Sequence, residues 1–206
     1  MGIETQPLTL VTGDGLRLVG DLAMPAGGAT AGAVVCHPHP KYGGDRFNGV
    51  VESVVQALSE AGVAALRFDF RGVNESDGPL GDGISERQDV RAALDHLAPL
   101  IAGPLWLVGY SFGAVVALDV DDERAAGWVA IAPPLALMRA APLAAQDARP
   151  KHVVIAGQDQ FSPPDATLPI VAGWLNTSST VVPSADHFLR GHLVEIGRLA
   201  TEAITG

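Results

Sequence analysis

The fold is decided by the stretch Leu105-Trp106-Leu107-Val108-Gly109-Tyr110-Ser111-Phe112-Gly113-Ala114. Its first four residues form an apolar run that predicts a buried parallel strand, and the apolar run from Ala114 onward predicts a helix. Glycines two positions before and two positions after Ser111 remove the side chains that would clash at a sharp strand-to-helix turn. The free N–H groups at the start of the helix would face the serine oxygen, where negative charge can be stabilised. The stretch is typical of a turn that presents a nucleophilic serine, although a glycine-rich turn with an incidental serine has the same pattern.

Composition and charge narrow the class of protein. A chain of 206 residues fits one domain, 1–206, with a sizeable core. Hydrophobic residues make up 48% but aromatic residues only 5%, so aliphatic side chains must build that core. The net charge of −10 would repel phosphate backbones and anionic membranes, so we expect neither nucleic acid nor a membrane as a partner. No apolar run reaches the ~18 residues that a membrane-spanning helix needs.

The expected compartment is the cytoplasm. The stretch 1–7 has neither the basic region nor the apolar core of a signal peptide. Cys36 is the only cysteine, so no intrachain disulfide can form, which agrees with a reducing compartment. Because Cys36 lies in an apolar run, we interpret it as a small buried side chain.

Predicted strands and helices alternate along the chain after an antiparallel hairpin at 8–25. Further strands are expected at 31–37, 63–70, 105–108, 127–132, 151–157 and 180–183. Helices are expected at 47–61, 85–97 with Ser85 as the N-cap, from 112 onward, at 135–149 as one loose helix, at 165–175 and at the C-terminus. This pattern predicts an α/β fold, with a mostly parallel sheet of about eight strands and helices on both faces.

Polar side chains follow the strands at three decisive places. Ser111, Asp159 and His187 each come just after a predicted strand, and the carboxyl ends of parallel strands meet at one edge of a sheet. A serine hydroxyl needs a base, and that base is usually a histidine held in one tautomer by a carboxylate. The sequence therefore predicts these three residues as a catalytic triad, in the chain order Ser, Asp, His.

Several neighbouring residues have simpler interpretations. Asp165 is the alternative acid, but two preceding prolines and a helix start favour an N-cap. Asp186 adjoins His187 and is too close in sequence for the usual geometry of the third member. Asp69 and Arg71 are interpreted as structural, in a strand-end ion pair or as a brace for a turn.

The spacing of His37 and His39 is also found in metal sites, but no third ligand clusters with them. We therefore expect no metal site. His37 is expected instead to make hydrogen bonds that rigidify its loop. The chain lacks a dinucleotide fingerprint, a P-loop lysine motif and a His-Glu-x-x-His motif, so no cofactor is expected.

Five pieces of the sequence together resemble the α/β-hydrolase superfamily, and within it the small lidless esterase-like hydrolases. They are 36–40 with 43–44, 68–72, 109–113, 156–159 with 163–164, and 185–188. Two departures stand out: Asn74 occupies a position where relatives often have glycine, and the usual His-Gly motif is His37-Pro38. The resemblance implies an α/β-hydrolase fold. No cap domain is expected, because the gap between the strands at 127–132 and 151–157 is short.

The resemblance also implies two backbone donors that would form an oxyanion hole. One is the N–H of Phe112, directly after the serine. The other comes from the loop after the first buried strand, where the two prolines have no N–H. His39 is therefore the best candidate, with Lys41 or Tyr42 as the alternatives.

The expected function is that of a serine hydrolase that cleaves a small or exposed acyl ester of a small molecule through an acyl-serine intermediate. A thioesterase or a peptidase for small peptides would use the same residues. A binding protein that kept the fold without turnover also fits, because fold does not determine function. The oligomeric state stays open, although apolar helix faces could support a homodimer.

Overall fold

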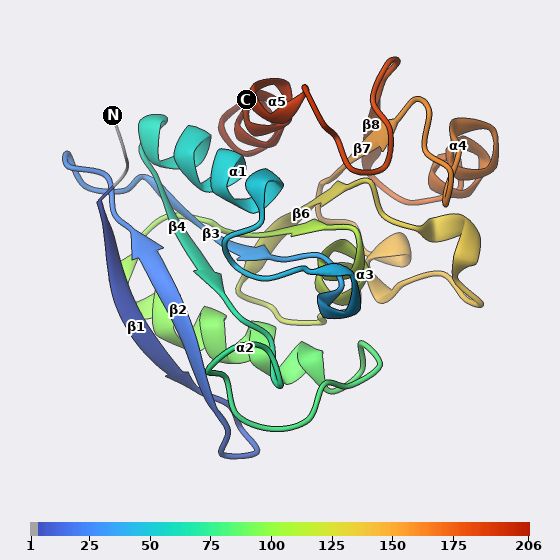
Figure 1. Cartoon of the computed structure of the whole chain (residues 1–206). Helices are drawn as coiled ribbons and strands as arrows, with labels where there is room; N and C mark the ends of the chain where they lie inside the picture. Colours follow the sequence, from blue (N-terminus) through green and yellow to red (C-terminus); the bar gives the residue numbers. More distant parts are fainter. Residues whose placement is uncertain (1–3) are drawn as a thin grey trace.

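One sheet of eight strands runs through the computed structural model, which describes residues 4–206 (Figure 1). The strands lie in the order β1-β2-β4-β3-β5-β6-β7-β8. Two neighbouring pairs, β1 with β2 and β2 with β4, are antiparallel, and the remaining pairs are parallel. The bounds are β1 Thr5–Val11, β2 Arg17–Ala23, β3 Ala31–Cys36, β4 Val63–Phe68, β5 Leu105–Tyr110, β6 Ala125–Ile131, β7 Lys151–Ala156 and β8 Thr177–Val182. The predicted mostly parallel sheet with a hairpin at its edge is confirmed.

Helices cover both faces of the sheet, as predicted. α1 and α5 pack side by side on one face, whereas α2, α3 and α4 lie on the other (Figure 1). The helices are α1 Gly49–Glu60, α2 Glu86–Leu97, α3 Phe112–Leu118, α4 Pro164–Ala172 and α5 Leu193–Thr205. Because both faces are covered, β3, β4 and β5 are buried along their whole length. Leu107 packs toward α2 and α3, and Val108 toward α1 and α5, which explains why these strands are continuous apolar runs.

The segment between β6 and β7 differs from the prediction of one loose helix at 135–149. It holds two separate 3-10 turns, η3 Leu135–Leu137 and η4 Leu143–Gln146. Pro142 lies directly before η4 in an extended conformation. Because proline has no N–H group, it cannot donate the backbone hydrogen bond that would continue a helix through this position. The connection carries no cap domain between the two strands.

One of the two predicted N-caps is wrong. Ser85 takes the N-cap position of α2, as predicted, but it has helical backbone angles and its side chain makes no capping bond. The Glu86 carboxylate accepts the Ser85 hydroxyl, 3.1 Å away, and the N–H groups of Gly81 and Gly83 in the loop before the helix. Asp165 lies inside the first turn of α4, since the helix already begins at Pro164, so its charge faces the positive end of the helix dipole.

Buried ion pairs hold the loop after β4. The structural interpretation of Asp69 and Arg71 is confirmed, although the two residues pair with different partners and not with each other. Asp69 accepts the backbone N–H and the guanidinium of Arg46. Arg71 is paired with Asp89, 2.7 Å away, and also with a carboxylate in the β1–β2 turn. Asn74 has a φ of 48°, in the left-handed region that asparagine tolerates better than most residues.

The stretch 1–7, in which no export signal is expected, starts with three residues outside the described ones. Within residues 4–206, no helix is both long enough and apolar enough to cross a membrane.

Candidate active site

Ser111 lies at the sharp turn between β5 and α3, as predicted. Its φ of 53° and ψ of −114° are strained for a residue with a side chain. A Cβ atom on Gly109 would overlap with the carbonyl of Gly113, and one on Gly113 would overlap with the carbonyls at the end of β3. Both glycines are therefore required by close backbone approach, and the turn holds the serine out from the edge of the sheet.

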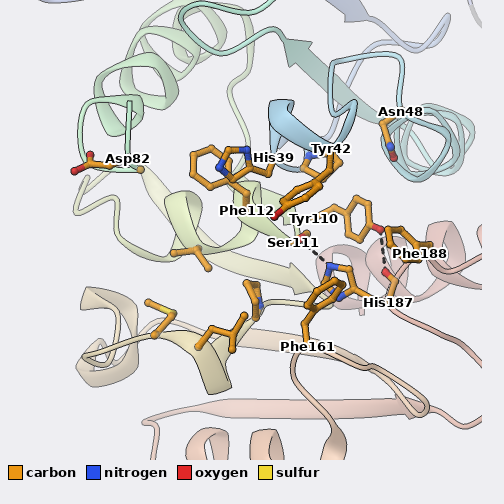
Figure 2. A pocket seen from close by; sticks show the side chains of 16 residues that line it. His39, Tyr42, Asn48, Asp82, Tyr110, Ser111, Phe112, Phe161, His187 and Phe188 are labelled. Atoms are coloured by element: carbon orange, nitrogen blue, oxygen red, sulfur yellow. Dashed lines mark hydrogen bonds between the residues drawn. The ribbon is translucent and has the colours of Figure 1, made fainter. Parts of the chain in front are cut away.

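The structure brings the three predicted residues together in one line of hydrogen bonds. Ser111 Oγ lies 2.9 Å from His187 Nε2 (Figure 2). On the other side of the imidazole, His187 Nδ1 lies 2.8 Å from Asp159 Oδ2. They follow three separate strands, β5, β7 and β8, which end at the same edge of the sheet. With Nδ1–H donating to the carboxylate, Nε2 is free to accept the proton of the serine hydroxyl.

The environment of Asp159 favours its charged form. The side chain is buried, with an exposed fraction of 4%, and burial alone would raise its pKa. Hydrogen bonds from His187 and from the N–H groups of Ser162 and Phe161 outweigh burial, so the pKa of Asp159 lies below its usual value. Asp159 is therefore a carboxylate at neutral pH, positioned to hold the imidazole in one tautomer.

Tyr110, inside the serine motif, also holds the loop that carries His187. Its hydroxyl donates to the backbone carbonyl of His187 over 2.9 Å, and the tyrosine is buried (Figure 2). The Phe161 ring packs edge-on against the imidazole, with the ring centres 4.8 Å apart. The sequence analysis did not find these two supports. The sequence signals for them were an aromatic residue directly before Ser111 and a second aromatic residue two positions after Asp159.

Replacing Tyr110 with phenylalanine should lower kcat while leaving KM nearly constant. The change removes one buried hydrogen bond, worth about 0.5–1.5 kcal/mol, so we expect a fall of about two- to tenfold. The readouts are kcat and KM for a p-nitrophenyl ester, together with the rate at which a fluorophosphonate reacts with Ser111. Both rates should fall by a similar factor. A variant that melts earlier but keeps wild-type rates would contradict a positioning role for Tyr110.

The candidate oxyanion donors belong to two residues that line the same pocket as Ser111. Within residues 4–206 the N–H groups of Phe112 and His39 have no recorded acceptor. The N–H groups of the two alternative donors are already used within the loop. Tyr42 N–H donates to the carbonyl of His39, and Lys41 N–H donates to Nδ1 of the His39 ring. The His39 ring packs on Phe112 with 4.8 Å between centres, which brings the loop after β3 next to the start of α3. His39 therefore remains the donor that this loop has available.

His37 rigidifies its loop, as predicted. The ring is fully buried, its Nδ1 lies 2.7 Å from the carbonyl of Pro38, and its Nε2 accepts the N–H of Phe70. This pattern assigns the neutral tautomer with the proton on Nδ1. Burial lowers the pKa of His37, which agrees with a neutral ring. Both ring nitrogens are used in joining the loops after β3 and β4, so neither is available to a metal ion.

A pocket of about 390 Å³ opens above Ser111 and His187 (Figure 2). Apolar side chains from α3 and from the β6–β7 connection line one part of it, among them Val115, Leu137 and Met138. Aromatic side chains from other loops complete the walls, and Tyr42 and Leu137 are strongly exposed at the mouth, at 85% and 65%. The site can therefore hold an apolar group beside the serine while staying open to solvent.

The model of the alpha/beta hydrolase family matches residues 33–194, a span that includes Ser111, Asp159 and His187. The chain belongs to the alpha/beta hydrolase family. Two solved structures show how closely the whole architecture of this alpha/beta hydrolase is shared. An alpha-beta serine hydrolase homologue from Coxiella burnetii is 28% identical to this chain, with a TM-score of 0.85. The match covers 100% of this chain and 99% of the Coxiella burnetii chain. XC6422 from Xanthomonas campestris, an a/b serine hydrolase without lid, is 27% identical with a TM-score of 0.85, covering 99% of this chain and 95% of its own.

One curated relative also resembles this alpha/beta hydrolase. Uncharacterized protein RP471 from Rickettsia prowazekii is 39% identical over 108 residues, which is 50% of this chain. The match covers 45% of the relative, so the chain corresponds to less than half of its length.

Proposed function

We propose that the protein hydrolyses carboxylic esters through an acyl-Ser111 intermediate. One observation carries this proposal: Ser111, hydrogen-bonded to His187 and through it to the buried Asp159, lines an open apolar pocket. A serine at a strained turn, paired with a histidine in the correct tautomer, is the arrangement required for acyl transfer.

In the first half of the reaction, Ser111 Oγ attacks the ester carbonyl while His187 Nε2 takes the hydroxyl proton. The N–H groups of Phe112 and His39 would stabilise the oxyanion that forms on the carbonyl oxygen. The C–O bond to the leaving alcohol then breaks, and His187 returns the proton to that oxygen. Asp159 keeps the imidazole oriented and stabilises its transient positive charge.

In the second half, water attacks the acyl-serine and His187 again accepts a proton. The new tetrahedral intermediate collapses to a carboxylic acid, and the proton returns to Ser111 Oγ. Each proton that His187 removes is delivered within the same half-reaction, so the cycle closes with no other reactant than water.

The open pocket supports a small or exposed acyl group as the substrate. Only the η3 and η4 turns separate β6 from β7, so nothing in this connection closes over Ser111. The XC6422 protein is described as a hydrolase without lid, which agrees with this architecture. A cavity of about 390 Å³ accommodates a short acyl chain together with part of a leaving group.

A p-nitrophenyl ester series from acetate to decanoate tests the proposal. We expect kcat/KM to be highest for short chains and to fall once the chain outgrows the apolar pocket. Parallel thioester and dipeptide substrates test the alternatives that use the same chemistry. Turnover of none of these compounds, together with no fluorophosphonate labelling of folded protein, would favour a binding protein without activity.

A further inference from the structure

Asn48 is held rigidly at the start of α1, and one side of its amide is left over. Its backbone N–H donates to the carbonyl of Asp45, and its own carbonyl accepts the N–H of Glu52. Its Oδ1 caps the helix by accepting the N–H of Val50 over 3.0 Å. Because only the oxygen of an amide can accept an N–H, this bond also fixes where Nδ2 lies. Within the part of the chain that the structure describes, Nδ2 has no recorded acceptor, so Asn48 presents a positioned donor that the protein itself does not use.

This donor lies on the side of the pocket that is formed by the loop carrying His187. Asn48 is one of the residues that line the pocket. On the next turn of α1, Ser53 Oγ donates over 2.6 Å to the carbonyl of Leu193, where the His187 loop ends and α5 begins. Figure 2 shows Asn48 and Phe188 on the same side of the pocket.

The opposite side of the pocket suits the acyl group. In Figure 2, Phe112 and Asp82 lie on the other side of Ser111 from Asn48. Val115 follows one turn after Phe112 on α3 and also lines the pocket, so this side offers apolar surface. The two ends of the pocket therefore differ in chemistry, with a hydrogen-bond donor at one end and apolar side chains at the other.

The other polar side chains of the pocket are less suited to act as donors beside the imidazole. The Tyr110 hydroxyl already donates to a backbone carbonyl, and the Asp82 carboxylate has no proton to donate. Tyr42 is 85% exposed, so water competes for its hydroxyl. The His39 ring packs on the first residue of α3, on the acyl side. Asn48 is thus the donor that is both fixed in place and near the His187 loop.

We propose that Asn48 determines specificity for the leaving alcohol, by donating a hydrogen bond from Nδ2 to an oxygen atom on that alcohol. This inference rests on the proposed ester hydrolysis. His187 Nε2 must deliver its proton to the leaving oxygen, so the alcohol lies on the imidazole side of Ser111, where Asn48 is found. The preferred substrate is then an ester of an apolar acid with an alcohol that carries a second oxygen, as a hydroxyl or an ether.

Two pairs of butyrate esters test this preference. The 2-methoxyethyl and 3-methoxypropyl esters carry an ether oxygen at two different distances from the ester. The n-butyl and n-pentyl esters match them in length, with a methylene in place of the ether oxygen. The measurement is the ratio of kcat/KM for the ether ester to kcat/KM for the alkyl ester within each pair. A change that merely damages the enzyme lowers both values and leaves this ratio constant.

Variants assign the ratio to Asn48. Asn48→Asp keeps an oxygen that can cap α1 but has no N–H, and Asn48→Gly is a tolerated N-cap without any side-chain donor. In both variants the ratio should fall about two- to tenfold for at least one pair, which is the loss expected for one hydrogen bond. Asp45→Asn is the matched control in the same loop. Asp45 does not line the pocket, and an amide oxygen can still accept the N–H of Phe47, so its ratios should equal those of the wild type.

The inference and the proposed function fail in different ways. Ratios that stay at the wild-type value in both Asn48 variants would overturn the inference alone. Turnover of p-nitrophenyl butyrate without turnover of either ether ester would overturn it as well. If the wild type hydrolyses none of these esters, p-nitrophenyl butyrate included, the proposed function itself is wrong.

Discussion

Replacement of Ser111 with alanine should lower ester hydrolysis by about four to six orders of magnitude, because no other group can form the acyl intermediate. The fold should remain intact. The hydroxyl makes one recorded side-chain hydrogen bond, to His187, and alanine fits the same backbone as well as serine does. The measurements are kcat/KM with p-nitrophenyl acetate, circular dichroism and labelling by a fluorophosphonate, which should disappear.

A second serine provides a matched control for this experiment. Ser184 Oγ lies 3.3 Å from His192 Nε2, and His192 Nδ1 lies 3.1 Å from Glu195. This group resembles the Ser111 line in its chemistry, but Ser184 is exposed and is not at a strand-to-helix turn, and none of the three residues lines the pocket above Ser111. Ser184→Ala should therefore keep wild-type rates and labelling. Unchanged turnover in Ser111→Ala would disprove the nucleophile assignment.

Replacement of Asp159 with asparagine should lower kcat by about 10³- to 10⁴-fold while leaving the protein folded. The amide oxygen can still accept the N–H groups of Phe161 and Ser162, so the loop keeps its shape. An amide NH₂ facing His187 Nδ1 would instead favour the tautomer with the proton on Nε2. That tautomer cannot accept the proton of Ser111. Asp165→Asn is the control, and wild-type activity is expected for it because Asp165 lies in the first turn of α4.

The same variant has an expected pH signature in stability. The pKa of Asp159 is lower in the folded protein than its ordinary value, so its charge stabilises the fold above that ordinary value. This contribution is lost as the pH falls through the lowered pKa. The difference in free energy of unfolding between wild type and Asp159→Asn should therefore be larger at pH 7 than at pH 3, as measured by urea denaturation. An equal difference at both pH values would contradict the shift.

The sequence was sufficient to predict the sheet and the place of its polar loops. Strands covered on both faces must be apolar throughout, so the runs around Val34 and Leu107 could be recognised without a structure. Because Ser111, Asp159 and His187 each follow a strand of the parallel part of the sheet, the three were then required to meet at one edge. Local hydrogen-bond competition was not predictable, because the Ser85 hydroxyl bonds to the Glu86 carboxylate and caps no N–H group of α2.

Long-range side-chain contacts were also outside what the sequence could indicate. The bond from Tyr110 to the carbonyl of His187 joins residues 77 positions apart, and no periodicity records it.

The irregular connection between β6 and β7 has a consequence for how this enzyme scaffold can change. Residues 132–150 contribute Leu137 and Met138 to the pocket, yet they add no strand to the sheet and no α-helix to either layer. Most of the exposed positions in this segment can be exchanged, lengthened or shortened with little loss of core burial. Substrate range can therefore diversify here by insertion or replacement, while the strand ends that carry Ser111, Asp159 and His187 stay fixed.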